Sequence, residues 1–237
     1  SGMGGQANTP VTNSFSNFAG SIQSNISPNT TSGFSIVTYT GTGSNATIGH
    51  GLSSVPTTIL CKSLGGNDWV SYHAPLGNVD TLRLNETGAK VSSATSFNST
   101  SPTNTVFSIG TDSKTNSNGT VHVAYCFSDV QGFSKMGSYV GNGSTDGTFI
   151  YTGFKPAMMI FKPTSTTGNW FLLDNKRDTI NPLTLSLFPN LASAETGTYT
   201  SDFLSNGIKI RLSANPNSSG VSYIYMAFAE NPFTSSA

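Results

Sequence analysis

Short runs in which apolar and polar residues alternate follow one another along most of the chain. Residues 34–39 read Phe-Ser-Ile-Val-Thr-Tyr, and residues 57–62 are rich in β-branched side chains. Alternation of this kind, broken roughly every 8 to 12 residues by Gly, Asn or Pro, is typical of antiparallel strands. The predicted strands are 34–39, 57–62, 69–73, 82–84, 105–109 and 121–127, then 149–151, 158–162, 170–173, 185–187, 203–204, 208–212 and 223–228. A short helix is indicated only at 190–195.

The second half of the chain repeats the pattern of the first half at a nearly constant offset. The residues matched 100 positions apart are Tyr39, Gly41, Gly43, Pro56 and Lys62 with Tyr139, Gly141, Gly143, Pro156 and Lys162. The pairs Trp69 with Trp170 and Phe127 with Phe228 lie 101 positions apart. A fixed repeat period of this kind indicates an internal duplication.

These patterns predict an all-β protein of two tandem, homologous antiparallel β-sandwiches of the jelly-roll kind. We expect the first repeat at residues 32–133 and the second at 134–237, and a single merged sandwich of both repeats is the alternative. Residues 1–31 are mostly Ser, Asn, Gly and Thr, and we expect a flexible leader or linker there. Its first residues, Ser1-Gly2-Met3, indicate a remnant of an expression vector.

The composition excludes several classes of partner. Charged residues make up 9% of the chain, and the formal net charge is zero, whereas globular proteins average about 25% charged residues. The chain therefore lacks the basic stripe needed to bind nucleic acid or an anionic membrane surface. No apolar run approaches the ~18 residues of a membrane span. A neutral surface rich in Ser, Thr, Asn and Gly is common in extracellular and virion β-proteins.

The two cysteines, Cys61 and Cys126, each lie inside a predicted strand of the first repeat. Their counterparts in the second repeat are Phe161 and Ala227. Positions that accept Phe and Ala are core positions, and a free Cys packs as a small hydrophobic residue. We therefore predict buried free thiols, with a disulfide as the alternative.

No metal or cofactor is expected. The chain has no Gly-x-Ser-x-Gly nucleophile motif and no phosphate-binding loop. The histidines, His50, His73 and His122, form no ligand pair of the kind that binds zinc. Residues 112–119 place polar side chains at every second position, as a calcium loop does, but Lys114 occupies a ligand position and no Glu closes the loop. A polar turn is the favoured interpretation.

The alternation in the last strand of the first repeat also predicts an orientation. His122 stands between Val121 and Val123, so it is expected on the opposite sheet face from them. We expect this histidine to face solvent or the other repeat.

One dense charged cluster stands out in the second repeat. Asp174, Lys176, Arg177 and Asp178 directly follow the Trp170 strand, and the first repeat has His73 at the corresponding place. These side chains could bind a sugar, or the two carboxylates could act as a glycosidase pair if the loop brings them within about 5–9 Å. The other interpretation is an ion-paired, solvated turn.

The two tryptophans, Trp69 and Trp170, allow two interpretations. Exposed at strand ends, they would form platforms for sugar rings. Kept in both repeats, they would belong to a shared core, where large aromatic residues are common.

Several segments resemble a known group of proteins. Residues 33–52 in the first repeat and 137–144, 152–156, 176–182 and 225–233 in the second resemble a duplicated domain of virion and tail-associated proteins of marine tailed phages. The resemblance covers nearly everything after the leader. It implies a tail-fibre or particle-surface module, and it implies no catalytic residues.

We therefore expect a non-enzymatic virion module that is assembled in the host cytoplasm and presents loops to a host-surface glycan or protein. The candidate binding residues are Trp170, Asp174, Lys176, Arg177, Asp178, Trp69 and His73. Other virion proteins are expected partners, and a homo-oligomer is left open. The alternatives are a carbohydrate-active tail enzyme using Asp174 and Asp178, and a purely architectural protein with no ligand.

Overall fold

The computed structural model of the protein describes residues 14–197 and 199–232. These residues form seventeen β-strands, one α-helix, α1 (Ser113–Asn116), and one 3-10 helix, η1 (Ala74–Leu76). Neighbouring strands in every sheet are antiparallel. The predicted all-β class is confirmed. The short helix expected at 190–195 is wrong, because that segment has an irregular backbone.

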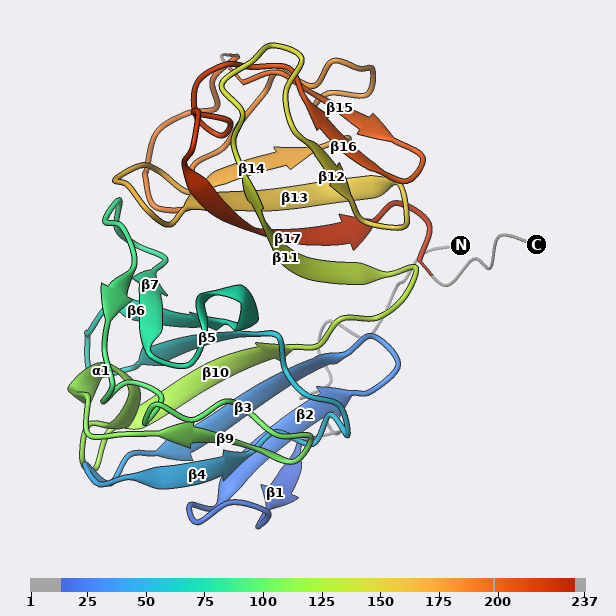
Figure 1. Ribbon diagram of the computed structural model, residues 1–237. Coiled ribbons are helices and arrows are strands. Elements are labelled where there is room, and N and C mark those ends of the chain that lie inside the picture. Colours follow the sequence, from blue (N-terminus) through green and yellow to red (C-terminus); the bar gives the residue numbers. More distant parts are fainter. Residues whose placement is uncertain (1–13, 198, 233–237) are drawn as a thin grey trace.

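Strands β1–β10 form lobe 1, in which two sheets pack face to face (Figure 1). The large sheet has the order β1-β2-β3-β10-β5-β6-β7-β8, and β4 and β9 form the small sheet. The strands are β1 (Phe15–Asn17), β2 (Ser24–Asn29), β3 (Phe34–Thr40), β4 (Ala46–Gly49), β5 (Thr58–Ser63), β6 (Trp69–His73), β7 (Asp80–Arg83), β8 (Val91–Ser92), β9 (Val106–Ile109) and β10 (Val121–Phe127). Val37 and Ile59 of the large sheet meet Ile48 and Phe107 of the small sheet in one buried core.

Strands β11–β17 form lobe 2, which is also a two-sheet sandwich (Figure 1). Its four-stranded sheet has the order β11-β17-β13-β14, and its three-stranded sheet has the order β12-β16-β15. The strands are β11 (Ser134–Val140), β12 (Phe149–Tyr151), β13 (Pro156–Pro163), β14 (Phe171–Asp174), β15 (Ser201–Leu204), β16 (Gly207–Ile210) and β17 (Ser222–Ala229). The two sets of strands therefore form separate sandwiches and not one merged sandwich.

The two lobes share a strand order and several hydrogen bonds. The order β3-β10-β5-β6 in lobe 1 corresponds to β11-β17-β13-β14 in lobe 2. The amide of Gly41 donates to the carbonyl of Thr120 at 2.9 Å, and the amide of Gly141 donates to the carbonyl of Val221 at the same distance. The two lobes thus share these features, and the duplication itself stays a prediction from the sequence.

Strand β10 shows how alternation along the chain sorts side chains between the two sheet faces. Ala124 and Cys126 are fully buried, whereas Val121 is 43% exposed on the opposite face. Cys61 is also buried, and both cysteines are free. The prediction of buried free thiols is confirmed.

His122 lies on the opposite sheet face from Val121 and Val123, as predicted, but the expectation that it faces solvent or the other repeat is wrong. Its side chain is fully buried in lobe 1, where the imidazole stacks on the ring of Tyr39 with centroids 5.2 Å apart. Its Nδ1 lies 2.9 Å from the carbonyl oxygen of Thr120. The core accepts this polar ring because the backbone satisfies its nitrogen. Tyr139 and Tyr223 form the corresponding stack in lobe 2, with centroids 4.9 Å apart.

The prediction of a flexible leader through residue 31 is wrong for the part that the structure describes. Residues 15–17 and 24–29 are β1 and β2, and β2 pairs along its whole length with β3. Ile26 is 1% exposed and packs in the core of lobe 1. A mostly polar segment can join a sheet because the backbone supplies the pairing, and here one aliphatic side chain anchors it. Residues 1–13 lie outside the described residues.

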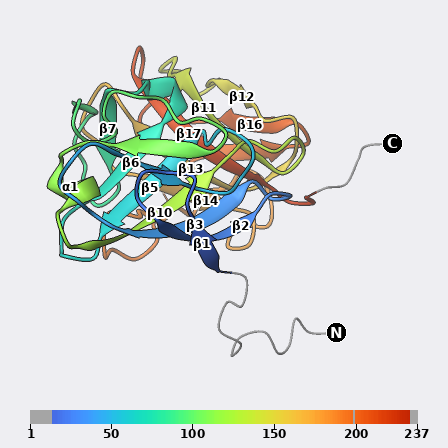
Figure 2. The same cartoon turned by 90° about the horizontal axis from the view of Figure 1, so that it is seen from below.

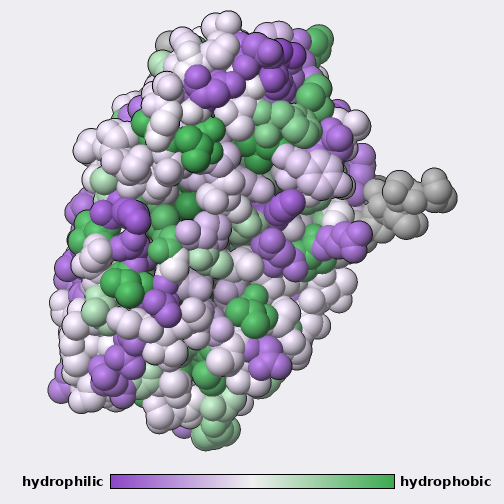
Figure 3. Space-filling view, in the orientation of Figure 1, coloured by the Kyte–Doolittle hydropathy of each residue, from purple (hydrophilic) through white to green (hydrophobic). Residues whose placement is uncertain are grey.

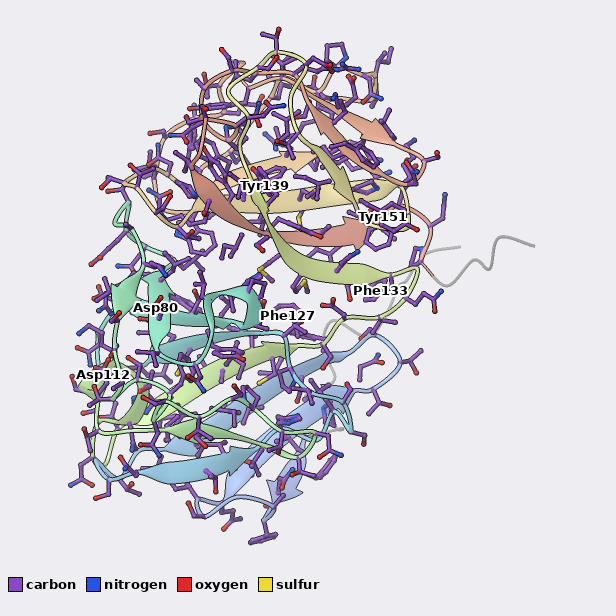
Figure 4. The ribbon with its side chains drawn as sticks, in the orientation of Figure 1. Asp80, Asp112, Phe127, Phe133, Tyr139 and Tyr151 are labelled. Atoms are coloured by element: carbon purple, nitrogen blue, oxygen red, sulfur yellow. The ribbon has the colours of Figure 1, made fainter. Side chains whose placement is uncertain are left out.

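The lobes meet through the outer faces of the large sheet and the four-stranded sheet (Figures 1 and 2). Leu82 of lobe 1 packs with Trp170 and Ile224 of lobe 2 in a separate buried cluster. At the other side of the boundary, where Figure 4 labels Phe127, its ring lies 6.0 Å from the ring of Phe228. Apolar contacts on both sides of the boundary hold the two sandwiches together.

Candidate functional site

The charged cluster predicted from the sequence forms a compact turn at the end of β14. Asp174 Oδ1 accepts hydrogen bonds from the backbone amides of Lys176 and Arg177, both at 2.9 Å. Its Oδ2 lies 2.7 Å from Arg177 Nε in an ion pair. Partial burial acts to raise the pKa of Asp174, but the hydrogen bonds from Arg177 and Lys176 outweigh it, so this pKa is lowered.

Asp178 is held in the same way by backbone groups from the next segment. Its Oδ2 accepts from the amides of Thr184 at 2.5 Å and Leu185 at 2.6 Å. Desolvation acts to raise the pKa of Asp178, but these amide hydrogen bonds outweigh it and the net shift is downward. Arg177 also reaches Glu195 at 3.2 Å. The cluster is therefore an ion-paired turn in which both carboxylates hold the local backbone.

Of the four charged residues predicted as a binding cluster in this turn, Lys176 is the one that lines an open hollow. The hollow has a volume of about 250 Å³ and is lined by Lys155, Asn175, Lys176, Thr179, Asn181, Leu183, Phe203 and Glu230. Glu230 lies 2.8 Å from Lys155 Nζ and accepts from Asn175 Nδ2 at 2.7 Å. Sequence reasoning missed these neighbours, because residues 155 and 230 reach the turn only through the pairing of β13 with β17.

Trp170 and His73 are buried at the lobe boundary, which corrects their assignment as ligand-binding residues. Trp170 is 2% exposed, and its Nε1 donates to the carbonyl of Arg83 in lobe 1 at 2.9 Å. His73 is 1% exposed, and its Nε2 lies 3.1 Å from the carbonyl oxygen of Tyr225 in lobe 2. Both side chains join the lobes and present no surface to a ligand.

Trp69 lies in a different environment from its counterpart. It is half-buried on the outer face of the large sheet, and its ring is nearly parallel to that of Tyr125, at an interplanar angle of 18° and a centroid distance of 6.0 Å. Tyr125 is in turn parallel to Phe34, at 5° and 6.3 Å. Three aromatic rings from three strands thus form a row, and all three keep part of their surface exposed.

Exposed aliphatic side chains extend this row into a larger apolar surface. On the same face, Ile36 is 36%, Val121 43% and Leu64 64% exposed. We call these six residues, Phe34, Ile36, Leu64, Trp69, Val121 and Tyr125, the aromatic face. Exposed apolar side chains on one sheet face indicate an interaction surface.

Polar and charged groups border the aromatic face at Trp69. The Trp69 amide donates to Asn85 Oδ1 at 2.9 Å, and Asn85 Nδ2 donates to Asp68 at 3.0 Å. Lys62 Nζ donates to the carbonyl of Asn67 on the same side. Amides and carboxylates at the rim of an aromatic surface are the groups that fix the orientation of a polar ligand.

The other polar residues considered as metal ligands, in the loop 112–119 and at His50, form hydrogen bonds to the backbone. Asp112 caps α1 by accepting from the amide of Lys114 at 3.0 Å, and Asn116 is fully buried. The Nε2 atom of His50 lies 3.1 Å from the carbonyl oxygen of Thr103. Across residues 14–197 and 199–232, no three His, Cys, Asp or Glu side chains are grouped so as to hold a metal ion. Over the same residues, no helix has the length and apolar character needed to cross a membrane.

A family model described as Domain of unknown function (DUF7483) matches residues 8–232. The chain belongs to this family. The match runs through both lobes and includes β1 and β2, so the family describes the two sandwiches together with the strands that precede β3. No curated protein and no solved structure matches the chain.

Proposed function

We propose that the protein is a non-enzymatic recognition module of a tailed-phage particle, and that it binds a host-surface ligand through the aromatic face. The observation that carries the proposal is the row of partly exposed rings of Phe34, Tyr125 and Trp69, set on a large sheet whose other face is a packed core. Rigid sheets hold such rings in place at little cost in side-chain entropy, which suits recognition.

A glycan is the ligand that this surface fits best. Flat aromatic rings cover the apolar face of a sugar ring. The side-chain amide of Asn85 beside Trp69 already bonds the Trp69 amide and Asp68, and it keeps a second donor hydrogen and a second lone pair for hydroxyl groups. The chain has zero formal net charge, and the view in Figure 3 is mostly pale, with separate hydrophobic and hydrophilic patches. Such a surface favours an uncharged polar ligand over a charged polymer.

The place of the module on a phage particle rests on the sequence resemblance. It implies a tail-fibre or particle-surface location, with other virion proteins as neighbours. The two-lobed scaffold suits this role, because surface features on a rigid β-sandwich can vary while the core stays the same.

The geometry of Asp174 and Asp178 does not favour the enzymatic alternative. A glycosidase needs one carboxyl group whose pKa is raised, so that it can donate a proton near neutral pH. Both of these pKa values are lowered, and both carboxylates are engaged by backbone amides. Their arrangement suits a structural turn.

The test is to incubate the protein with a glycan array and with host cells, and to measure both retention and released saccharides. We expect retention without product, unchanged in Asp174→Asn. Released product that disappears in Asp174→Asn would establish the enzyme. Failure to bind any glycan or cell, together with specific binding to another virion protein, would establish the architectural role.

A further inference from the structure

The outer edge of β11 in lobe 2 is open at the place where the matching edge in lobe 1 is occupied. In lobe 1, β2 pairs with β3 and continues the large sheet to β1. In lobe 2, β11 matches β3, yet it is the terminal strand of its sheet. The described part of lobe 2 therefore contains no counterpart of β2.

The hydrogen bonds show which groups of β11 face this edge. The Gly141 amide donates toward β17, to Val221, while the Met136 amide points the other way and donates to Asp129 Oδ1 at 3.1 Å. Since strand residues alternate between the two edges, Ser134, Met136, Ser138 and Val140 face outward.

Some of these outward groups are satisfied within the chain. Ser134 pairs with Val130, and the Val140 carbonyl accepts from Thr148 Oγ1 at 3.0 Å. The Met136 carbonyl, both backbone groups of Ser138 and the Val140 amide have no hydrogen-bond partner among the described residues.

Two hollows are lined in part by residues of β11. Ser138 and Val140 lie beside a cleft of about 570 Å³ at the lobe boundary, walled on the lobe 1 side by Pro75 and Leu76 of the η1 segment. Ser134 and Lys135 lie beside a second hollow of about 340 Å³.

The second hollow is lined on its other side by the end of β12, where Tyr151 is labelled in Figure 4.

Lobe 1 shows what kind of segment suits such an edge. There, a Cβ built on Gly51 would lie 2.5 Å from Ile26 Cδ1, so the loop after β4 closes tightly over the aliphatic side chain of β2. In lobe 2 the loop after β12 has Gly153, also with positive φ, and it lines the 340 Å³ hollow. An aliphatic side chain of an added strand would enter this hollow as Ile26 does in lobe 1.

We infer that the open edge of β11 accepts one extended segment of another polypeptide, neutral and polar with one aliphatic side chain, in antiparallel pairing. Main-chain hydrogen bonds to Met136, Ser138 and Val140 would provide affinity, and the aliphatic side chain in the hollow would provide selectivity, as in β-strand addition to other sheets. A particle-surface module could be attached to a neighbouring virion protein in this way.

The test uses a fluorescent peptide with the sequence of residues 21–31, which contains β2, titrated with the full chain. We expect saturable binding that is lost when the peptide carries Ile26→Asp. Ser138→Pro removes an outward amide that makes no bond within the fold, and edge strands accept proline, so it should weaken binding by about tenfold. Ser138→Lys, which blunts the edge with a charge, serves as a second variant if Ser138→Pro misfolds.

Amide hydrogen exchange distinguishes the outcomes. Binding at the proposed edge should slow exchange at Ser138 and Val140. No binding, binding that both Ser138 variants leave unchanged, or protection confined to β3 would overturn the inference. Protection of Ser138 that rises with protein concentration without peptide, together with a dimer in sedimentation, would also overturn it, because the occupant would then be a second copy.

Discussion

Asn116 and Asn217 make equivalent hydrogen bonds in the two lobes. Each side chain is fully buried. Asn116 links the Gly-x-Gly turn after β3 to the loop before β10, and Asn217 links the Gly-x-Gly turn after β11 to the loop before β17. Asn116 Nδ2 donates to the carbonyls of Ser44 at 2.7 Å and Gly110 at 2.6 Å. Asn217 Nδ2 donates to those of Ser144 and Leu212, both at 2.9 Å.

Replacing Asn217 with alanine should lower the free energy of unfolding by about 2–4 kcal/mol, because several buried backbone groups lose their partner. Urea unfolding measures this change. The matched control is Asn118→Ala at an exposed position, which should change stability by less than about 0.5 kcal/mol. Equal effects of the two variants would contradict the role given to Asn217.

His73 should make stability depend on pH. Burial at the lobe boundary lowers its pKa from 6.5 to about 4, and its Nδ1 has no hydrogen-bond partner in the described residues. The folded state therefore binds the proton more weakly than the unfolded chain. Its contribution to stability is full above pH 6.5 and is lost as the pH falls toward 4, by about 3 kcal/mol in total.

The measurement is the free energy of unfolding at several pH values between 7 and 4.5. His73→Gln should show a shallower decline over this range than the wild type. Some slope should remain, since burial also lowers the pKa values of His50 and His122. An unchanged slope would show that His73 takes up its proton without cost.

At the scale of elements, β2 is an integral strand of lobe 1. Its sequence, Ser-Asn-Ile-Ser-Pro-Asn, carries one large aliphatic side chain. Ile26→Ala should cost about 2–4 kcal/mol of stability through the cavity that it leaves, as measured by thermal or urea unfolding. Asn25→Ala, at the exposed neighbouring position, should have little effect. A small effect of Ile26→Ala would mean that β2 is only loosely attached.

The sequence predicted strands well where apolar alternation is strong. The segments 34–39, 69–73 and 121–127 are strands in the structure, with bounds that agree to within a residue. β1 and β2 were missed because their pairing comes from backbone groups, which residue types do not reveal. The order of strands in each sheet also depends on long-range pairing.

The candidate site could be predicted only in part. The chain places Trp69 and Trp170 at corresponding positions, and nothing local distinguishes them. Trp170 is buried because Leu82 and Ile224 pack on it across the lobe boundary. Trp69 stays partly exposed in a row with Tyr125, from which it is separated by β5. Contacts between lobes and between non-adjacent strands decide this difference, so the sequence could name Trp69 but not its neighbours.

At the scale of the whole molecule, the boundary between the lobes should make them unfold together. The boundary includes the apolar cluster around Trp170 and direct hydrogen bonds between the lobes. Lys162 Nζ also reaches the carbonyl of Gly88 at 2.8 Å. Such an interface couples two domains more strongly than a flexible linker does.

Calorimetry should therefore show one unfolding transition for the wild type. Trp170→Ala removes a buried indole and should cost about 3–5 kcal/mol, and it should split the transition into two as the lobes uncouple. Trp69→Ala, at a half-buried position outside this cluster, should keep a single transition. Two transitions in the wild type would mean that the lobes fold independently.

The most direct test of the recognition proposal compares the aromatic face with the charged turn. The measurement is the Kd of wild type, Trp69→Ala and Lys176→Ala for host cells or for a glycan found on the array. The aromatic face predicts that Trp69→Ala weakens binding by at least about tenfold, while Lys176→Ala stays close to wild type. Loss of binding in Lys176→Ala with full binding in Trp69→Ala would contradict the proposal and would place recognition at the hollow beside the turn in lobe 2.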